Sequence, residues 1–239
     1  MKKIAIIGAG ISGLYIANLF KDNEDYQVTI YEKKSSIEID EGYGIQLSVN
    51  SIELLNKIGF SSLSEEEKFN PKKIDFYEIK NLKKICDLDI SKFNSNSCKY
   101  TTLKRSKLIQ FLKKQLTDDT IKYNHSIDQI DLNKDSIRLI FNNNKITCDY
   151  LIISDGVFSK GKSLISKNES KPIYNETIAI RGNLSKKNLQ NLNQENISLF
   201  LGSNFHYVVY PINKDKDYNF IGILKHKLNL NDQKNSNLF

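Results

Sequence analysis

Three glycines near the start of the chain have the spacing of a phosphate-binding turn. Gly8-Ala9-Gly10-Ile11-Ser12-Gly13 follows an apolar run at 3–7, which predicts a buried strand, and opens a stretch that predicts a helix over 13–21. The first glycine permits a tight turn, the second lets a ligand approach the backbone, and the third lets helix and strand pack closely. Unpaired N–H groups at the start of the helix would attract a pyrophosphate.

An acidic residue stands where such a turn needs one. Glu32 ends a second predicted strand over 27–31 and lies 19 residues after Gly13. The usual distance in dinucleotide-binding units is about 20 residues. Its carboxylate would accept hydrogen bonds from the ribose hydroxyls. The turn and the acid together predict a Rossmann-type dinucleotide site, and a glycine turn in an unrelated α/β protein is the alternative.

Later segments resemble the class A flavoprotein monooxygenases, which include para-hydroxybenzoate and salicylate hydroxylases. The run 41–50, EGYGIQLSVN, is similar to the family's GxGIxLxPN stretch, with Val49 in place of the proline. Arg105 begins a segment similar to the family's R-x-x-L helix. The run 154–159, SDGVFS, is similar to its ADGxxS element, although the trailing arginine is Lys162 here.

Two more segments are similar to the salicylate-hydroxylase-like branch of this family. Ile180-Arg181-Gly182 resembles its WRG strand, and the run 202–211 resembles its G…H-x-x-x-Y-P substrate strand. The chain has only three arginines, yet Arg105 and Arg181 both fall at motif positions. The arginine fork binds phosphate or carboxylate bidentately, which lysine cannot do.

The resemblance implies that the bound dinucleotide is FAD, with NADH or NADPH as co-substrate. The residues that it implies as FAD contacts are Gly8, Gly10, Ser12, Gly13, Glu32, Lys33, Gly44, Gln46, Arg105, Ile127, Asp155 and Gly156. Gln46 would approach the flavin ring or the substrate.

The resemblance also implies that Arg181, His206 and Tyr210 contact the substrate. His206 and Tyr210 would be the catalytic residues, orienting a phenol-like substrate and helping to deprotonate it. In an extended strand both lie on one face, about 13 Å apart, so they cannot both hold one atom. A histidine on the sheet surface and a half-buried tyrosine are the structural alternative.

Composition excludes several other classes of function. The chain of 239 residues has a net charge of +7, but its lysines alternate with acids, so no nucleic-acid surface is predicted. No apolar run approaches the roughly 18 residues of a membrane helix. Cys86, Cys98 and Cys148 lack metal-site spacing and are interpreted as reduced thiols of a cytoplasmic protein, with no metal site.

The pattern of elements predicts an α/β fold with two domains. A Rossmann-type FAD-binding domain is expected over 1–72 and 99–172, interrupted by a hairpin. A second, mostly antiparallel β-sheet forms the substrate domain over 73–98 and 173–239, and it looks incomplete. Its later strands are predicted at 177–184, 197–201, 205–212 and 218–224.

The implied activity is that of an FAD-dependent monooxygenase, in which NAD(P)H and O2 serve to hydroxylate a phenol-like or benzoate-like substrate. The family's second flavin segment, of GDAAH type, has no counterpart, because the sequence contains no Gly-Asp dipeptide. We therefore expect a partial or inactive chain, completed by another chain or present as a homo-oligomer. The alternatives are an NAD(P)-binding reductase of Rossmann type and a non-catalytic FAD-binding fragment.

Overall fold

Two units make up the chain in the computed structural model. The structure describes residues 1–37, 43–134, 136–142, 144–166, 172–185, 189, 192–215 and 217–227. The first unit comprises Met1–Glu41, Leu55–Phe60 and Ser106–Pro172. The second comprises Gly42–Leu54, Ser61–Arg105 and Ile173–Phe239. Glu41 and Gly42 of the predicted flavin stretch, and the tail after residue 227, lie outside the described residues.

A parallel sheet forms the centre of the first unit. Its four strands, in spatial order, are β12 (Tyr150–Ile153), β1 (Lys2–Ile7), β2 (Tyr26–Tyr31) and β8 (Ile121–Lys122). All three neighbouring pairs run parallel. The last four residues of β1 are buried, as expected for the central strand of a parallel sheet. The predicted Rossmann-type unit is therefore confirmed.

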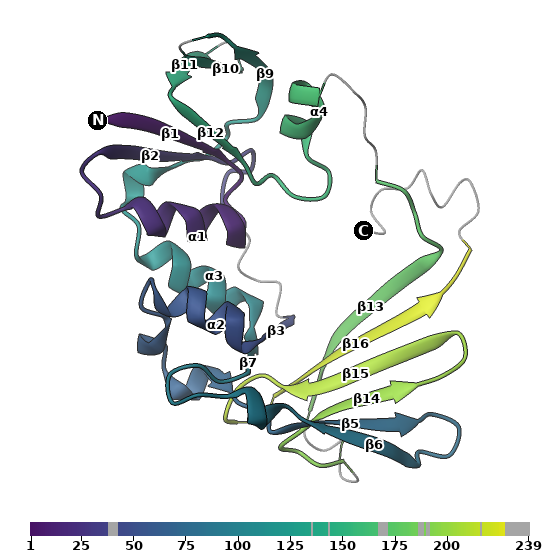
Figure 1. Cartoon of the computed structure of the whole chain (residues 1–239). Coiled ribbons are helices and arrows are strands. Elements are labelled where there is room, and N and C mark those ends of the chain that lie inside the picture. The colour runs from purple at the N-terminus through teal and green to yellow at the C-terminus, as the bar shows by residue number, and fades with distance from the viewer. Residues whose placement is uncertain are drawn as a thin grey trace. The chain divides into compact units, whose positions relative to one another are not determined.

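Helices and a small meander pack around this sheet (Figure 1). The helices of this region are α1 (Ile11–Phe20), α3 (Arg105–Lys114) and α4 (Lys160–Ser166), and the antiparallel meander is β9 (Ile127–Leu132), β10 (Ile137–Phe141) and β11 (Asn144–Cys148). Asn18 joins two of the helices, because its buried amide donates to the carbonyl oxygens of Leu14 at 2.9 Å and Leu112 at 2.8 Å. The meander packs on β1 through a shared apolar cluster that includes Ile7 and Leu139.

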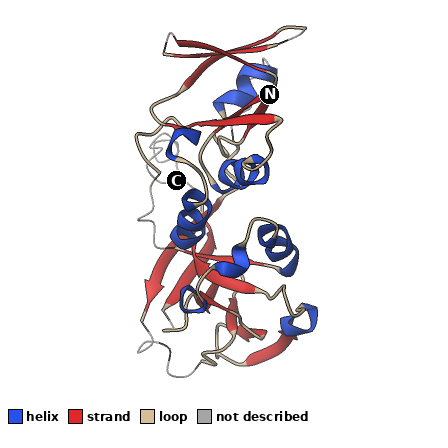
Figure 2. Ribbon diagram, turned by 90° about the vertical axis from the view of Figure 1, so that its left-hand side faces the viewer, coloured by secondary structure: helices blue, strands red, loops and turns tan. Residues whose placement is uncertain are grey.

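A six-stranded sheet dominates the second unit, and Figure 2 shows its strands in red. The strands, in spatial order, are β13 (Thr177–Leu184), β16 (Tyr218–Lys225), β15 (Phe205–Pro211), β14 (Ile197–Leu201), β5 (Lys73–Glu78) and β6 (Lys84–Asp89). Only the β14–β5 pair is parallel. The predicted hairpin thus joins the later strands in one mostly antiparallel sheet, which confirms the predicted fold class.

The boundaries between the units differ from those expected. Residues 43–54, 61–72 and 99–105 were expected in the FAD-binding domain, but they belong to the second unit. The reason is a three-stranded sheet of β3 (Gly44–Leu47), β7 (Thr101–Lys104) and β4 (Lys68–Phe69), which is tied to the large sheet. The Gly44 N–H donates to Asn219 Oδ1 at 2.6 Å, and the Thr102 hydroxyl donates to the Pro211 carbonyl at 2.5 Å.

Several short elements complete the fold. The helix α2 (Val49–Asn56) is followed by a turn in which Gly59 has a φ of +85°. The 3-10 helices are η1 (Phe60–Ser62), η2 (Glu65–Glu67), η3 (Ile90–Phe93) and η4 (Asp118–Thr120). Pro211 is the last residue of the internal strand β15 and lies beyond the β14 ladder, so no sheet hydrogen bond is lost. No helix in the described part of the chain is long and apolar enough to cross a membrane.

Candidate functional site

The three positions of the turn are occupied by glycine for different structural reasons. Gly8 has a φ of +101°, and a Cβ there would lie 2.6 Å from the Ser154 carbonyl oxygen. A Cβ on Gly13 would lie only 2.0 Å from the Gly8 carbonyl oxygen. These two glycines are therefore required by packing within the unit. A Cβ on Gly10 would meet no atom within 4 Å, so this position leaves open space beside the turn.

No side chain in the described part of the chain caps the start of α1. Gly10 is the N-cap in an extended conformation and offers no side chain to the N–H groups of the first turn. No acidic residue lies in that turn, and Ser12 is exposed within it. Its unpaired N–H groups and the positive end of the helix dipole are therefore available to an anion.

Glu32 is held beside this turn by two backbone donors. Its Oε2 accepts from the Ala9 N–H at 2.8 Å, and its Oε1 accepts from the Lys34 N–H at 3.0 Å. Each carboxylate oxygen keeps a further lone pair for an outside donor. The half-buried carboxylate is thus oriented before any ligand binds.

A cavity of ≈ 310 Å³ connects these groups within the first unit. The lining residues are Ile7, Gly8, Gly10, Tyr31, Glu32, Lys33, His125, Ser126, Ile127, Ser154, Asp155, Gly156, Phe158 and Lys160. The structure therefore brings together Gly8, Gly10, Glu32, Lys33, Ile127, Asp155 and Gly156 from the predicted cofactor residues. Ile127 also belongs to the buried apolar cluster of this unit.

Asp155 stabilises a loop that lines the cavity by accepting two hydrogen bonds. One carboxylate oxygen of Asp155 accepts from the Gly161 N–H at 3.0 Å, and the other accepts from the Ser159 hydroxyl. These bonds fix the loop that leads into α4. Gly156 adopts a φ of +84°, a conformation that favours glycine. Asp155 therefore acts on the loop and not as an unpaired acid.

Gln46, Tyr100 and Tyr210 form a polar group in the second unit. The Tyr100 hydroxyl donates to Gln46 Oε1 at 2.9 Å. Tyr210 is 1% exposed, and burial raises the pKa of its hydroxyl to about 12, although a hydrogen bond with the Gln46 side chain opposes this. Burial also raises the pKa of Tyr100. Both tyrosines are therefore neutral hydrogen-bonding groups near pH 7, and Tyr210 is buried beyond direct access for a substrate.

The other predicted substrate residues lie on the same face of the large sheet. The strand register places Arg181 opposite Ile221, Ile221 opposite Val208, and Tyr210 two residues from Val208. His206 is exposed on this face, toward the other end of β15. The guanidinium carbon of Arg181 lies 5.9 Å from the centre of the Tyr43 ring, a cation–π contact.

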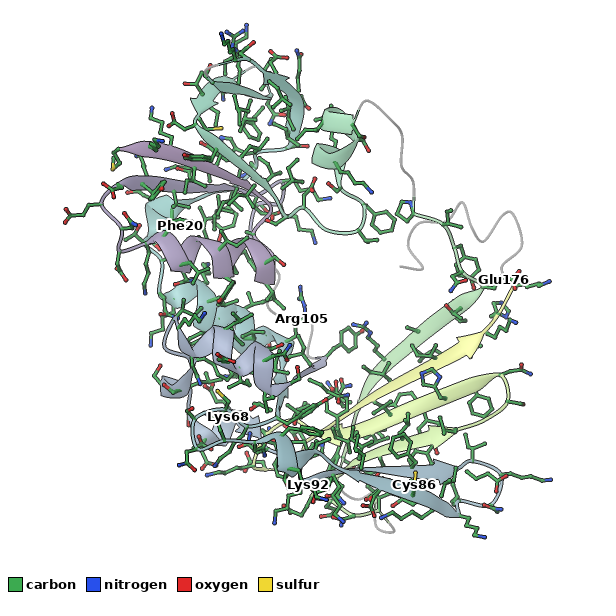
Figure 3. All side chains as sticks on the ribbon, in the orientation of Figure 1. Phe20, Lys68, Cys86, Lys92, Arg105 and Glu176 are labelled. Carbon is green, nitrogen blue, oxygen red and sulfur yellow. The ribbon has the colours of Figure 1, made fainter. Side chains whose placement is uncertain are left out.

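Gly44 and Arg105 occupy strand and helix starts in the second unit. A Cβ on Gly44 would lie 2.7 Å from the Asn219 Cβ, so glycine is required there by packing. Arg105, labelled in Figure 3, is the first residue of α3. Its backbone N–H donates to the Tyr43 carbonyl at 2.8 Å.

His125 is a cavity residue that sequence reasoning did not identify. It has no neighbour at informative sequence spacing, but it is half-buried and lines the cavity. Its backbone N–H donates to the Glu32 carbonyl at 2.8 Å. Only the tertiary fold brings residue 125 to the end of β2.

Known proteins share this architecture. Residues 6–37 match the model of an NAD(P)-binding Rossmann-like domain. Over 215 residues the chain is 24% identical to the 3-amino-4-hydroxybenzoate 2-monooxygenase PtnB3 of Streptomyces platensis. The alignment covers 88% of this chain and 53% of that protein. Klebsiella pneumoniae HpxO complexed with FAD and uric acid superposes with a TM-score of 0.83 at 16% identity, covering 96% of this chain and 58% of that one.

A salicylate hydroxylase substrate complex superposes with a TM-score of 0.79 at 17% identity, covering 95% of this chain and 56% of that one. The chain has the fold of the class A FAD-dependent aromatic hydroxylases. This confirms the resemblance drawn from the motifs. The chain spans just over half the length of the relatives that it matches.

Proposed function

We propose that the chain binds FAD and belongs to a monooxygenase that hydroxylates an aromatic substrate with NAD(P)H and O2. The observation that carries the proposal is the cavity of the first unit. There an uncapped helix start, the open space at Gly10 and the fixed carboxylate of Glu32 meet in one place. An ADP group offers a pyrophosphate and two ribose hydroxyls that match these features.

The residues present fit the ADP half of FAD. The N–H groups at the start of α1, near Ser12, would hold the pyrophosphate, and the free lone pairs of Glu32 would accept from the ribose hydroxyls. Lys33 and Lys160 add positive charge at the cavity wall. Arg105 is proposed as a further FAD contact through its fork. When bound, the flavin supplies the redox and oxygen-transfer chemistry, and the protein orients the substrate and excludes water.

For the substrate we propose an anionic phenol or benzoate. Arg181 offers a guanidinium that pairs with a carboxylate, and it lies on the same sheet face as His206 and Tyr210. PtnB3 and salicylate hydroxylase are both named for hydroxybenzoates. Tyr210 serves as a positioning residue, because it is buried and bonded to Gln46, and it keeps its proton near pH 7. The exposed His206 is then the candidate proton acceptor.

An NAD(P)-binding reductase is the second candidate, since the family model that matches residues 6–37 is that of an NAD(P)-binding domain. The glycine turn and Glu32 suit either dinucleotide. A visible spectrum of the purified protein, a flavin extraction and parallel titrations with FAD and NADH distinguish the two candidates. Bound yellow flavin and tighter binding of FAD support the monooxygenase. Binding of NADH without FAD would overturn it.

Because the chain spans just over half the length of its relatives, we propose that a further polypeptide segment, in this or another chain, completes the flavin site. Oxygen uptake with hydroxybenzoates, measured with and without catalase, would separate substrate hydroxylation from peroxide release.

A cytoplasmic location is proposed from the free cysteines Cys86, Cys98 and Cys148.

A further inference from the structure

His125 lines the cavity of the first unit and packs against two aromatic rings. Its ring centre lies 5.6 Å from that of Tyr31 and 5.6 Å from that of Phe141, and those two rings stack at 4.7 Å. Aromatic neighbours on two sides leave the imidazole little freedom to turn. The ring is therefore held in one orientation at the cavity wall.

The hydrogen bond of this imidazole determines its tautomer. His125 Nδ1 lies 2.6 Å from the Tyr123 carbonyl oxygen. A carbonyl oxygen only accepts, so Nδ1 must hold the proton of the hydrogen bond. In the neutral ring Nε2 is then a bare acceptor. The ring edge opposite the Tyr123 carbonyl thus offers a lone pair and no donor.

The backbone around His125 is fixed to the segment that contains the ribose-binding acid. The His125 N–H donates to the Glu32 carbonyl at 2.8 Å, and the Asn124 N–H donates to the Lys34 carbonyl at 3.1 Å. Asn124 has a φ of +60°, a left-handed conformation that asparagine tolerates better than most residues. This turn places His125 and Glu32 in the lining of the same cavity.

We propose that His125 recognises the base of the cofactor by accepting a hydrogen bond at Nε2 from the 6-amino group of adenine. This inference rests on the proposed binding of FAD in the cavity. Glu32 binds the ribose, so the base attached to that ribose extends along the wall formed by Lys33, His125 and Ser126. A lone pair at that wall favours a purine with an amino donor over one without it. His125 is thus a specificity-determining residue for the nucleotide.

The test compares two probes that differ only at the 6-position of the purine. ADP has the amino group, and purine riboside 5′-diphosphate lacks it. Both are titrated at the same pH against FAD bound to the parent protein, to His125→Phe and to His226→Phe. Phenylalanine keeps the contacts with Tyr31 and Phe141. His226 is exposed in the second unit and provides the matched control.

The parent and His226→Phe are expected to bind ADP about fivefold to tenfold more tightly than the analogue, which is the range for one hydrogen bond. In His125→Phe this preference should fall to about one. A preference that survives in His125→Phe would overturn the proposal. Should that variant fail to fold, equal affinity of the parent for both probes would overturn it. A parent that binds FAD without this preference refutes only the role of His125, whereas failure to bind FAD or ADP refutes the proposed function.

Discussion

Two glycines of the turn differ in why they must be glycine, and this difference yields a sharp prediction. A Cβ on Gly13 would lie 2.0 Å from the Gly8 carbonyl oxygen, whereas ordinary contact begins at 3.4 Å. The backbone would therefore have to move by about 1.4 Å in Gly13→Ala. Overpacking of this kind typically costs about 1–3 kcal/mol. Gly13→Ala is thus expected to lower the free energy of unfolding by at least about 2 kcal/mol.

Gly10→Val should affect binding and leave folding nearly unchanged. A Cβ at this position meets no atom within 4 Å, and the backbone has a φ of −77° and a ψ of −176°, which suit a branched residue. A poorer N-cap costs up to about 1 kcal/mol, and the loss of glycine flexibility in the unfolded chain offsets part of it. The side chain would occupy the space proposed for the pyrophosphate, so FAD affinity should fall at least about tenfold, or roughly 1.4 kcal/mol.

The assay pairs urea unfolding of each ligand-free variant with FAD titration, followed by flavin fluorescence. Each variant should change mainly one of the two measured quantities. Gly13→Ala should lower the free energy of unfolding, and Gly10→Val should lower the FAD affinity while the free energy of unfolding stays nearly unchanged. If Gly10→Val binds FAD as tightly as the parent, the pyrophosphate does not lie at this turn. If Gly13→Ala unfolds at the parent's urea concentration, the close approach to Gly8 is not as the structure describes.

Three further predictions concern single side chains. In Glu32→Gln an NH2 donor replaces one carboxylate oxygen and faces the backbone N–H of either Ala9 or Lys34, so FAD affinity should fall about tenfold, and an unchanged dissociation constant would contradict the ribose assignment. Arg105→Lys should weaken FAD binding by about 1.5–3 kcal/mol in the same titration, and equal affinity would exclude a fork contact. The folded-state pKa of Tyr210 is about 12, above the unfolded value near 10, so the stability that its protonated hydroxyl contributes is present below pH 10 and lost between about pH 10 and 12. The free energy of unfolding, measured with urea across that pH range, should fall less steeply in Tyr210→Phe than in the parent. Identical slopes of this free energy against pH would refute the raised pKa.

The sequence alone determined the nucleotide-binding half of the fold with good accuracy. The spacing of Gly8, Gly10, Gly13 and Glu32 reflects local requirements, namely a tight turn, a close approach and an acid at a strand end. Such requirements act within some thirty residues, so the chain order reveals them. The strands after residue 172 were also predicted within one or two residues, because alternation of apolar and polar side chains is a local property.

Only the tertiary structure decided which distant residues meet. The second unit takes in residues 43–54 and 99–105 because Gly44 bonds to Asn219 and Thr102 bonds to Pro211, pairs separated by more than a hundred residues. Tyr210 was predicted to contact the substrate, and the structure buries it beside Gln46, because its ring packs in an apolar cluster with Ile90, Ile197 and Ile212. His125 reaches the cavity through backbone bonds to Glu32. No local pattern encodes these contacts, since they depend on how strands far apart in the chain come to lie side by side.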